Sequence, residues 1–166
     1  MTDWSIPHCV AGARHLVDVA RRHGAAPEVS LAGTGLLPSH VEDGEAEVSA
    51  EQELRVIRNV MAALPRVEGL ALEVGSRFQI TDFGFWGYAL FSSRSLREAL
   101  KLALRYLDLS AIFGEVEFVE HQDQASLCLN YAKVPADVRN FLLERDAAAI
   151  IRIQRLVDSR PTPPTR

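Results

Sequence analysis

The chain has 166 residues, of which 48% are hydrophobic and 24% are charged, and its formal net charge is −4 at pH 7. These values are typical of one globular domain and exclude a fibrous or largely disordered chain. The negative charge argues against direct binding of a phosphate backbone, which usually requires a basic surface. No apolar run reaches the roughly 18 to 20 residues that cross a bilayer, so we expect a cytoplasmic protein with no membrane contact.

The first third of the chain predicts helices. Apolar residues follow helical spacing from Val10, and Gly24 is placed to end this helix. A short helix is expected from Pro27 through Ala32 and a turn over 38–41, followed by a loop in the acidic run EDGEAE (42–47). Ser49 and Gln52 then have the spacing of a capping box, and the helix that follows ends at Pro65.

The middle of the chain contains the stretch TDFGFWGYALF (81–91), whose periodicity fits a helix or a strand. We favour the helix. Ser95 then caps a regular amphipathic helix, with Glu98 in capping-box spacing.

In the last third of the chain the apolar pattern changes from helical spacing to alternation. The segments EVEFVEH (115–121) and SLCLNYA (126–132) alternate and predict a β-hairpin, with a further strand expected near residues 76–81 because two strands alone are marginal. A final helix is expected from about Ala136 to Val157, with apolar residues on more than one face, which suggests a second partner. The fold class is therefore α+β: a mostly helical single domain packed on a small antiparallel β-sheet or hairpin.

Residues suited to catalysis or metal binding are scattered. The five histidines share no i,i+4 spacing, and Cys9 and Cys128 are far apart, so both cysteines are expected to be buried or half-buried thiols. We expect no catalytic residues, no metal and no cofactor, and we place an enzyme below a sensor or an interaction module.

Five aromatic residues stand beside Gly84 and Gly87, and two interpretations stay open for them. They form part of the core, or they line a pocket in which the glycines leave space and polar ring tips contact a guest. The five are Phe83, Phe85, Trp86, Tyr88 and Phe91. A basic stripe follows them, which is either a solvated helix face or a site for an anionic partner: Arg94, Arg97, Lys101 and Arg105.

The segments GLALEVG (69–75) and DFGFWGYALFSSRSLREALKLALRY (82–106) resemble the amino-terminal ligand-binding and dimerisation domain of a subgroup of AraC-type transcriptional regulators. In this subgroup a GLxxG segment, a GYAL-x-SS stretch, a helix start and an RY pair recur in this order. Two departures concern the pocket: Arg94 stands where proline is frequent, and Phe85 and Trp86 replace aliphatic residues. The matching positions are Gly69, Leu70, Gly75, Gly84, Gly87, Tyr88, Ser92, Ser93, Ser95, Leu96, Glu98, Ala99, Leu100, Arg105 and Tyr106.

The resemblance implies an effector-binding and dimerisation domain over residues 1–158. Residues 159–166 would begin a linker to a helix-turn-helix domain absent from this chain, and DNA would be contacted only through that domain. From size and polar tips we expect the small-molecule effector to contact Phe83, Trp86, Tyr88, Arg105, Tyr106 and Tyr131.

The final helix is the expected seam of a homodimer, because some of its apolar residues approximate the spacing of a helix–helix seam. The residues are Leu142, Ala149, Ile153 and Leu156. The alternative is a stand-alone protein-interaction module that uses the same helix.

Overall fold

The computed structural model describes residues 7–44, 46–122 and 124–157. Its elements, in chain order, are β1 (His8–Cys9), α1 (Ala11–Arg22), α2 (Pro27–Ser30), α3 (Pro38–Glu42), β2 (Glu47–Val48), α4 (Ala50–Ala63), α5 (Leu70–Gly75), the 3-10 turn η1 (Ile80–Phe83), α6 (Gly84–Phe91), α7 (Leu96–Arg105), the 3-10 turn η2 (Leu107–Leu109), β3 (Glu115–Glu120), β4 (Ala125–Asn130) and α8 (Arg139–Val157).

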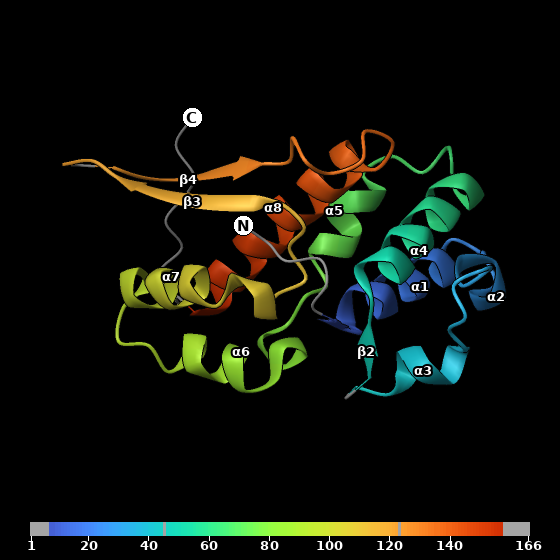
Figure 1. The fold of residues 1–166 in the computed structure, drawn as a ribbon, viewed down its shortest axis with the longest axis horizontal. Helices are drawn as coiled ribbons and strands as arrows, with labels where there is room; N and C mark the ends of the chain where they lie inside the picture. Colours follow the sequence, from blue (N-terminus) through green and yellow to red (C-terminus); the bar gives the residue numbers. More distant parts are fainter. Residues whose placement is uncertain (1–6, 45, 123, 158–166) are drawn as a thin grey trace.

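The helices α1 to α4 gather at one end of the molecule, and the β3–β4 hairpin with α6 and α7 occupies the other end (Figure 1). Between them, α8 and α5 pack side by side and join the two ends (Figure 1). The arrangement confirms the expected α+β class, with helices dominating and one antiparallel hairpin.

The main core lies where α1 meets α4, α5 and the first half of α8. Leu16 and Val19 from α1 and Ile57 from α4 have no exposed surface, and Leu142 of α8 is equally buried. Burial of this apolar surface is the main favourable term in folding, worth roughly 25 cal/mol per Å². This core therefore holds α8 firmly over its first turns.

The start of α4 confirms the predicted capping box. The Gln52 backbone N–H donates to Ser49 Oγ at 3.1 Å, and the Ser49 N–H donates to Gln52 Oε1 at 2.9 Å. The two bonds satisfy donors that the first helical turn leaves without intrahelical partners.

The ambiguous stretch forms helix α6, as we favoured. Gly84 begins it with a φ of +50°, a conformation that suits glycine. Gly87 is required by close packing, because a Cβ atom there would meet the Ile80 carbonyl oxygen at 1.9 Å. Of the two roles open to these glycines, Gly87 thus serves close contact of α6 with η1.

The cap of α7 is confirmed in part. Ser95 Oγ accepts from the Glu98 N–H at 3.2 Å, but the Glu98 carboxylate accepts from the Arg94 N–H rather than from that of Ser95. The helix ends at Arg105, and the chain continues into η2.

Two strand expectations differ from the structure. The strand near residues 76–81 is wrong: the Gln79 N–H donates to Asp82 Oδ2 at 2.7 Å, which closes a local turn and leads into η1. The second sheet instead pairs His8 with Val48 and Cys9 with Glu47, at the end of the acidic run expected to be loop. The hairpin is confirmed, with Glu115 opposite Asn130 and Glu120 opposite Ala125.

Smaller differences concern helix ends. The helix from Pro27 ends at Ser30, and α8 begins at Arg139, because residues 136–138 form a turn before it. Cys9 is half-buried as expected, whereas Cys128 on β4 is exposed. The expected linker at 159–166 lies outside the described residues.

Candidate functional site

A partly open cavity of about 100 Å³ lies between α6, α7, α8 and the β3–β4 hairpin. Its wall is apolar over most of its surface, and all four of these elements contribute to it. The lining residues are Phe78, Phe83, Trp86, Leu90, Leu96, Ala99, Leu100, Ala103, Leu104, Leu107, Ser110, Ala111, Ile112, Val116, Leu127, Asp146, Ala149, Ile150, Ile153, Gln154 and Val157. A concave, mainly apolar site with a few polar groups is the usual form of a small-molecule pocket.

The aromatic part of the wall is an ordered series of rings. Phe78 stacks on Phe83 with centroids 5.8 Å apart, and Phe83 meets Trp86 edge to face at 5.1 Å. Such ring pairs stabilise one another beyond the area that they bury. The rings therefore hold Trp86 in place at the cavity.

The indole N–H of Trp86 is buried, and no acceptor among the described residues lies within hydrogen-bonding distance of it. A buried donor without a partner is destabilising by about 1 to 3 kcal/mol. This nitrogen is buried from the cavity as well as from solvent.

The polar part of the wall consists of Ser110, Asp146 and Gln154. The Ser110 hydroxyl donates to the Leu107 carbonyl oxygen at 2.6 Å and accepts from the Ile112 N–H at 3.2 Å. It is therefore already engaged as donor and acceptor by its own loop.

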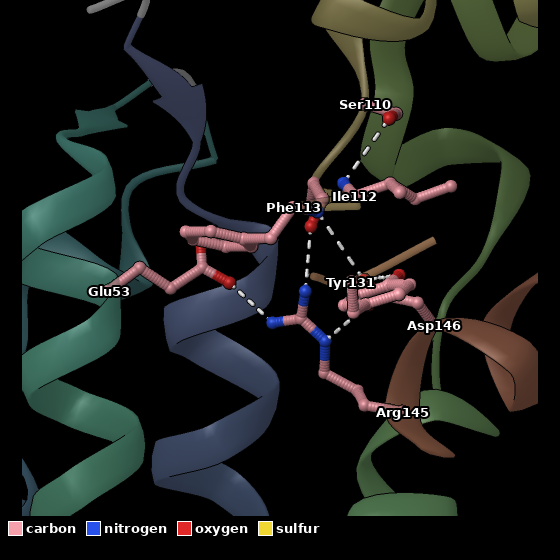
Figure 2. Close-up of polar contacts among 8 residues, drawn as sticks. Glu53, Ser110, Ile112, Phe113, Tyr131, Arg145 and Asp146 are labelled. Atoms are coloured by element: carbon pink, nitrogen blue, oxygen red, sulfur yellow. Dashed lines mark hydrogen bonds and ion pairs between the residues drawn. The ribbon is translucent and has the colours of Figure 1, made fainter. Parts of the chain in front are cut away.

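Asp146 belongs to a buried polar network centred on Arg145 (Figure 2). Arg145 donates from Nη1 to Glu53 Oε1 at 2.6 Å and from Nε to Asp146 Oδ1 at 2.7 Å, and neither Arg145 nor Glu53 has exposed surface. Arg145 Nη2 also donates to the Ala111 carbonyl oxygen at 2.6 Å. The guanidinium, which lies 5.6 Å from the centroid of the Phe113 ring, thus joins α4, α8 and the segment before β3.

The second oxygen of Asp146 is also occupied. Tyr131 donates its hydroxyl to Asp146 Oδ2 at 2.5 Å, and the Phe113 N–H donates to the same oxygen at 3.4 Å. Burial, followed by the charge of Asp146, raises the pKa of Tyr131. Tyr131 therefore serves as a hydrogen-bond donor in this network.

Charge on Arg145 is favoured by its surroundings. Burial alone would lower its pKa, but the charges of Asp146 and Glu53 outweigh burial and raise the pKa. Arg145 therefore stays charged, with an acceptor for each of its nitrogens: two carboxylates and one carbonyl oxygen.

The six residues expected at the effector site are not all at the cavity. Phe83 and Trp86 line it. Tyr88, Arg105 and Tyr106 are exposed on the outside of the molecule, and Tyr88 is 69% exposed. Tyr131 is buried behind the wall, where it contacts the lining residue Asp146.

The four residues of the expected dimer seam lie in different environments. Leu142 has no exposed surface and packs in the main core. Ala149 and Ile153 line the cavity, and Leu156 is half-buried. A seam along this line would therefore meet a partner through Leu156 rather than Leu142.

The basic stripe follows the exposed side of α7. Arg97 pairs with Glu120 of β3 at 2.8 Å, and Arg105 lies over the Tyr106 ring at 5.5 Å from its centroid. Of the two interpretations, these contacts favour a solvated helix face.

The buried network was missed, although its residues follow the apolar pattern. Arg145 and Asp146 lie three and four residues after Leu142, which places them on the buried face of α8. Glu53 stands four residues before Ile57 on the buried face of α4. Charged residues at core-facing positions of two helices are a signal of a buried ion pair.

The molecule is thus a mostly helical α+β domain with a small, mainly apolar pocket beside a buried ion-pair network. A family model described as "Arabinose-binding domain of AraC transcription regulator, N-term" matches residues 24–166. The chain therefore belongs to this family of regulator domains, as the resemblance implied.

Curated relatives agree with the family. The chain is 38% identical over 146 residues to uncharacterized HTH-type transcriptional regulators of Mycobacterium bovis and Mycobacterium tuberculosis, covering 88% of this chain and 42% of each relative. It is 25% identical over 118 residues to the ornithine utilization regulator of Pseudomonas aeruginosa, covering 71% of this chain and 34% of that protein. The chain thus spans less than half of the length of these relatives. No solved structure gave a significant match.

The described part of the chain contains neither a candidate membrane span nor a candidate metal site. No helix there is both long and apolar enough to span a membrane. Among the same residues, no three or more histidine, cysteine or acidic side chains come together as a metal site.

Proposed function

We propose that this chain is the sensor domain of an AraC-type transcription regulator and that a small organic effector binds in the cavity between α6, α7 and α8. Binding would change how an attached DNA-binding domain is held. An effector can do this only if its affinity differs between two arrangements of the protein. The observation that carries the proposal is a partly open, mainly apolar cavity whose wall is shared by α6, α7 and the second half of α8.

Helix α8 is suited to transmit the change. Its second half lines the cavity through Ala149, Ile150, Ile153 and Val157, and its first half is held in the main core by Leu142. An effector would therefore contact the half of α8 that leads towards the end of the chain. Binding without catalysis is also favoured, because the Ser110 hydroxyl donates to the Leu107 carbonyl oxygen rather than to a base.

A thermal-shift screen of the purified chain tests effector binding. Compounds that occupy the cavity should raise the melting temperature in proportion to the logarithm of their concentration and should be recovered unchanged. The variant Ala103→Leu fills the cavity from α7 and should remove the shift, whereas Ala62→Leu on the exposed face of α4 should not. A broad library without a single cavity-dependent shift would refute the sensor function.

We also propose a homodimer through the outer face of α8, where Leu143 and Ile151 are each 36% exposed and lie on neighbouring sides of the helix. DNA would be reached only through an attached domain. Sedimentation should give twice the chain mass for the wild type and the single mass for Leu143→Glu combined with Ile151→Glu. Leu142 is unsuitable for this test, because a polar residue there would disrupt the core.

The second candidate is a protein-interaction module, and the outer face of α6 favours it. Phe85 is 95% exposed, and Tyr88 and Phe91 continue the same helix face at spacings of three residues. Exposed aromatic patches frequently mark interaction sites. The module would be preferred if no compound stabilised the chain and if Phe85→Ser abolished its association with a partner.

A further inference from the structure

The side chains that line the cavity limit the chemical class of molecule that can bind there. Its polar groups are few, and most of them are already used within the protein. Asp146 accepts at both oxygens, and the Ser110 hydroxyl is engaged as donor and acceptor. Among the described lining residues, the remaining polar side chain is the half-buried amide of Gln154, since the Trp86 N–H is buried away from the cavity.

A sugar does not fit such a wall. A pentose carries several hydroxyl groups, each of which loses its water on entering an apolar cavity and needs a new partner. The Gln154 amide can serve only a small part of them. Burial of hydroxyls without partners is unfavourable, so the cavity discriminates against polyhydroxylated guests.

An anion does not fit either. Lysine, arginine and histidine are absent from the described residues that line the cavity, and the acidic residue of the wall is Asp146. The guanidinium of Arg145, which donates to the lining residue Asp146, also donates to Glu53 and the Ala111 carbonyl oxygen. A carboxylate guest would therefore lose its hydration without gaining a cation.

A small cation is disfavoured for a related reason. The charge of Asp146 is balanced by Arg145 at 2.7 Å, and its second oxygen accepts from Tyr131. An ammonium group would have to compete with these donors inside a mainly apolar space.

The size of the cavity sets a further limit. Its volume of about 100 Å³ compares with the roughly 150 Å³ of an apolar cavity that holds benzene. The enclosed part is thus smaller than a cavity that holds one ring, and the opening lets the remainder of a guest extend to solvent.

Building on the proposed sensing function, we propose that the effector is a neutral, mainly apolar organic molecule that is held by apolar contact with the cavity wall. The cavity rejects sugars, carboxylates and amino acids. The guest thus differs in chemistry from the sugar in the family description and from ornithine, which occurs in the name of the Pseudomonas relative.

Five probes test this class by isothermal titration calorimetry at pH 7. Acetophenone carries one carbonyl acceptor, and ethylbenzene has nearly the same shape without it. Benzoate adds a negative charge, and L-arabinose and L-ornithine represent the two alternatives. Acetophenone should bind at least about tenfold more tightly than benzoate, arabinose or ornithine, and Ala103→Leu should abolish its binding while Ala62→Leu should not.

The variant Trp86→Phe tests whether the guest is held by apolar contact, because it keeps an aromatic ring and removes the N–H. It should change the affinities for acetophenone and ethylbenzene by a similar factor. Weakening of acetophenone alone would show that the indole N–H binds the guest and would overturn this part of the proposal. Circular dichroism and the melting temperature of each variant establish that it is folded.

The outcomes separate the class of guest from the sensing function. If arabinose, ornithine or benzoate binds more tightly than acetophenone and loses binding in Ala103→Leu, the neutral apolar class is wrong but the sensing function stands. If acetophenone does not bind, the proposed class is overturned. If the broad library also yields no cavity-dependent ligand, the sensing function falls with it.

Discussion

Arg145 of α8 and Glu53 of α4 form an ion pair of 2.6 Å between side chains that have no exposed surface. They are 92 residues apart in the sequence, and Asp146 completes the network from the neighbouring position. Replacement of a charge in such a pair leaves its partner buried and uncompensated, which is strongly unfavourable.

Arg145→Ala should therefore lower the free energy of unfolding by about 3 to 5 kcal/mol, because Glu53 and Asp146 both lose their cation. Urea unfolding followed by circular dichroism measures this. Arg58→Ala is the matched control, since it breaks an exposed pair with Asp137. Equal losses of stability in the two variants would contradict a special contribution of the buried ion pairs of Arg145.

Gly75→Ala should destabilise the packing of α5 on α8. A Cβ atom at position 75 would meet the Arg145 carbonyl oxygen at 2.1 Å and Ala148 Cβ at 2.7 Å. Overpacking of this kind costs about 1 to 3 kcal/mol, which thermal unfolding detects. Gly44→Ala should be close to neutral, because the nearest atom, Arg14 Nη1, is 3.8 Å away. A neutral Gly75→Ala would mean that α5 and α8 separate easily.

Asp82 should make the stability of the protein depend on pH in the acid range. Burial acts to raise its pKa, but hydrogen bonds from His15 and the Gln79 N–H, together with the charges of His15 and Arg14, lower it overall. The stabilisation from Asp82 is therefore present above the ordinary pKa of about 3.9 and is lost as pH falls through the lower pKa of the folded state.

Asp82→Asn should accordingly lower the free energy of unfolding by about 1 to 3 kcal/mol at pH 7, and the difference from wild type should shrink below about pH 4. Denaturant titrations between pH 2.5 and 7 measure it. Asp18→Asn, at an exposed pair with Arg21, should show little pH dependence. A difference for Asp82→Asn that stays constant with pH would contradict the assignment.

The two cysteines should react at different rates. Burial raises the pKa of the Cys9 thiol to about 11, whereas Cys128 is exposed on β4. At pH 8 only about one in a thousand Cys9 thiols is ionised, and the thiolate is the reactive form. Ellman's reagent should modify Cys128 first and Cys9 at least about tenfold more slowly, and Cys128→Ser should remove the fast phase. Fast modification of Cys9 would contradict its burial.

Local features of the fold followed from the sequence. The Ser49 and Gln52 cap and the hairpin around residues 121–124 depend on neighbours within a few positions, so spacing was sufficient to predict them. The pairing of β1 with β2 was not predicted, because two-residue strands about 40 positions apart leave no periodic pattern.

The candidate site was predicted only where its residues are close together in the sequence. Phe83 and Trp86 are three residues apart and share one face of the chain that leads into α6, where they line the cavity. Tyr88 is two residues from Trp86, which in a helix places it on nearly the opposite side. Arg145, Asp146 and Glu53 meet only through tertiary packing, so their association could not be derived from local spacing.

Asp146 faces two ways, because it lines the cavity and is also held by Arg145 and Tyr131. A mutation of Asp146 that changed ligand specificity would therefore also remove its bonds to Arg145 and Tyr131 and destabilise the fold. Trp86 and Ala103 also line the cavity but form no ion pair or side-chain hydrogen bond among the described residues. Substitutions there can therefore change effector preference with less loss of stability. We therefore expect effector preference to be changed more readily through residues of α6 and α7 than through the junction of α4 with α8.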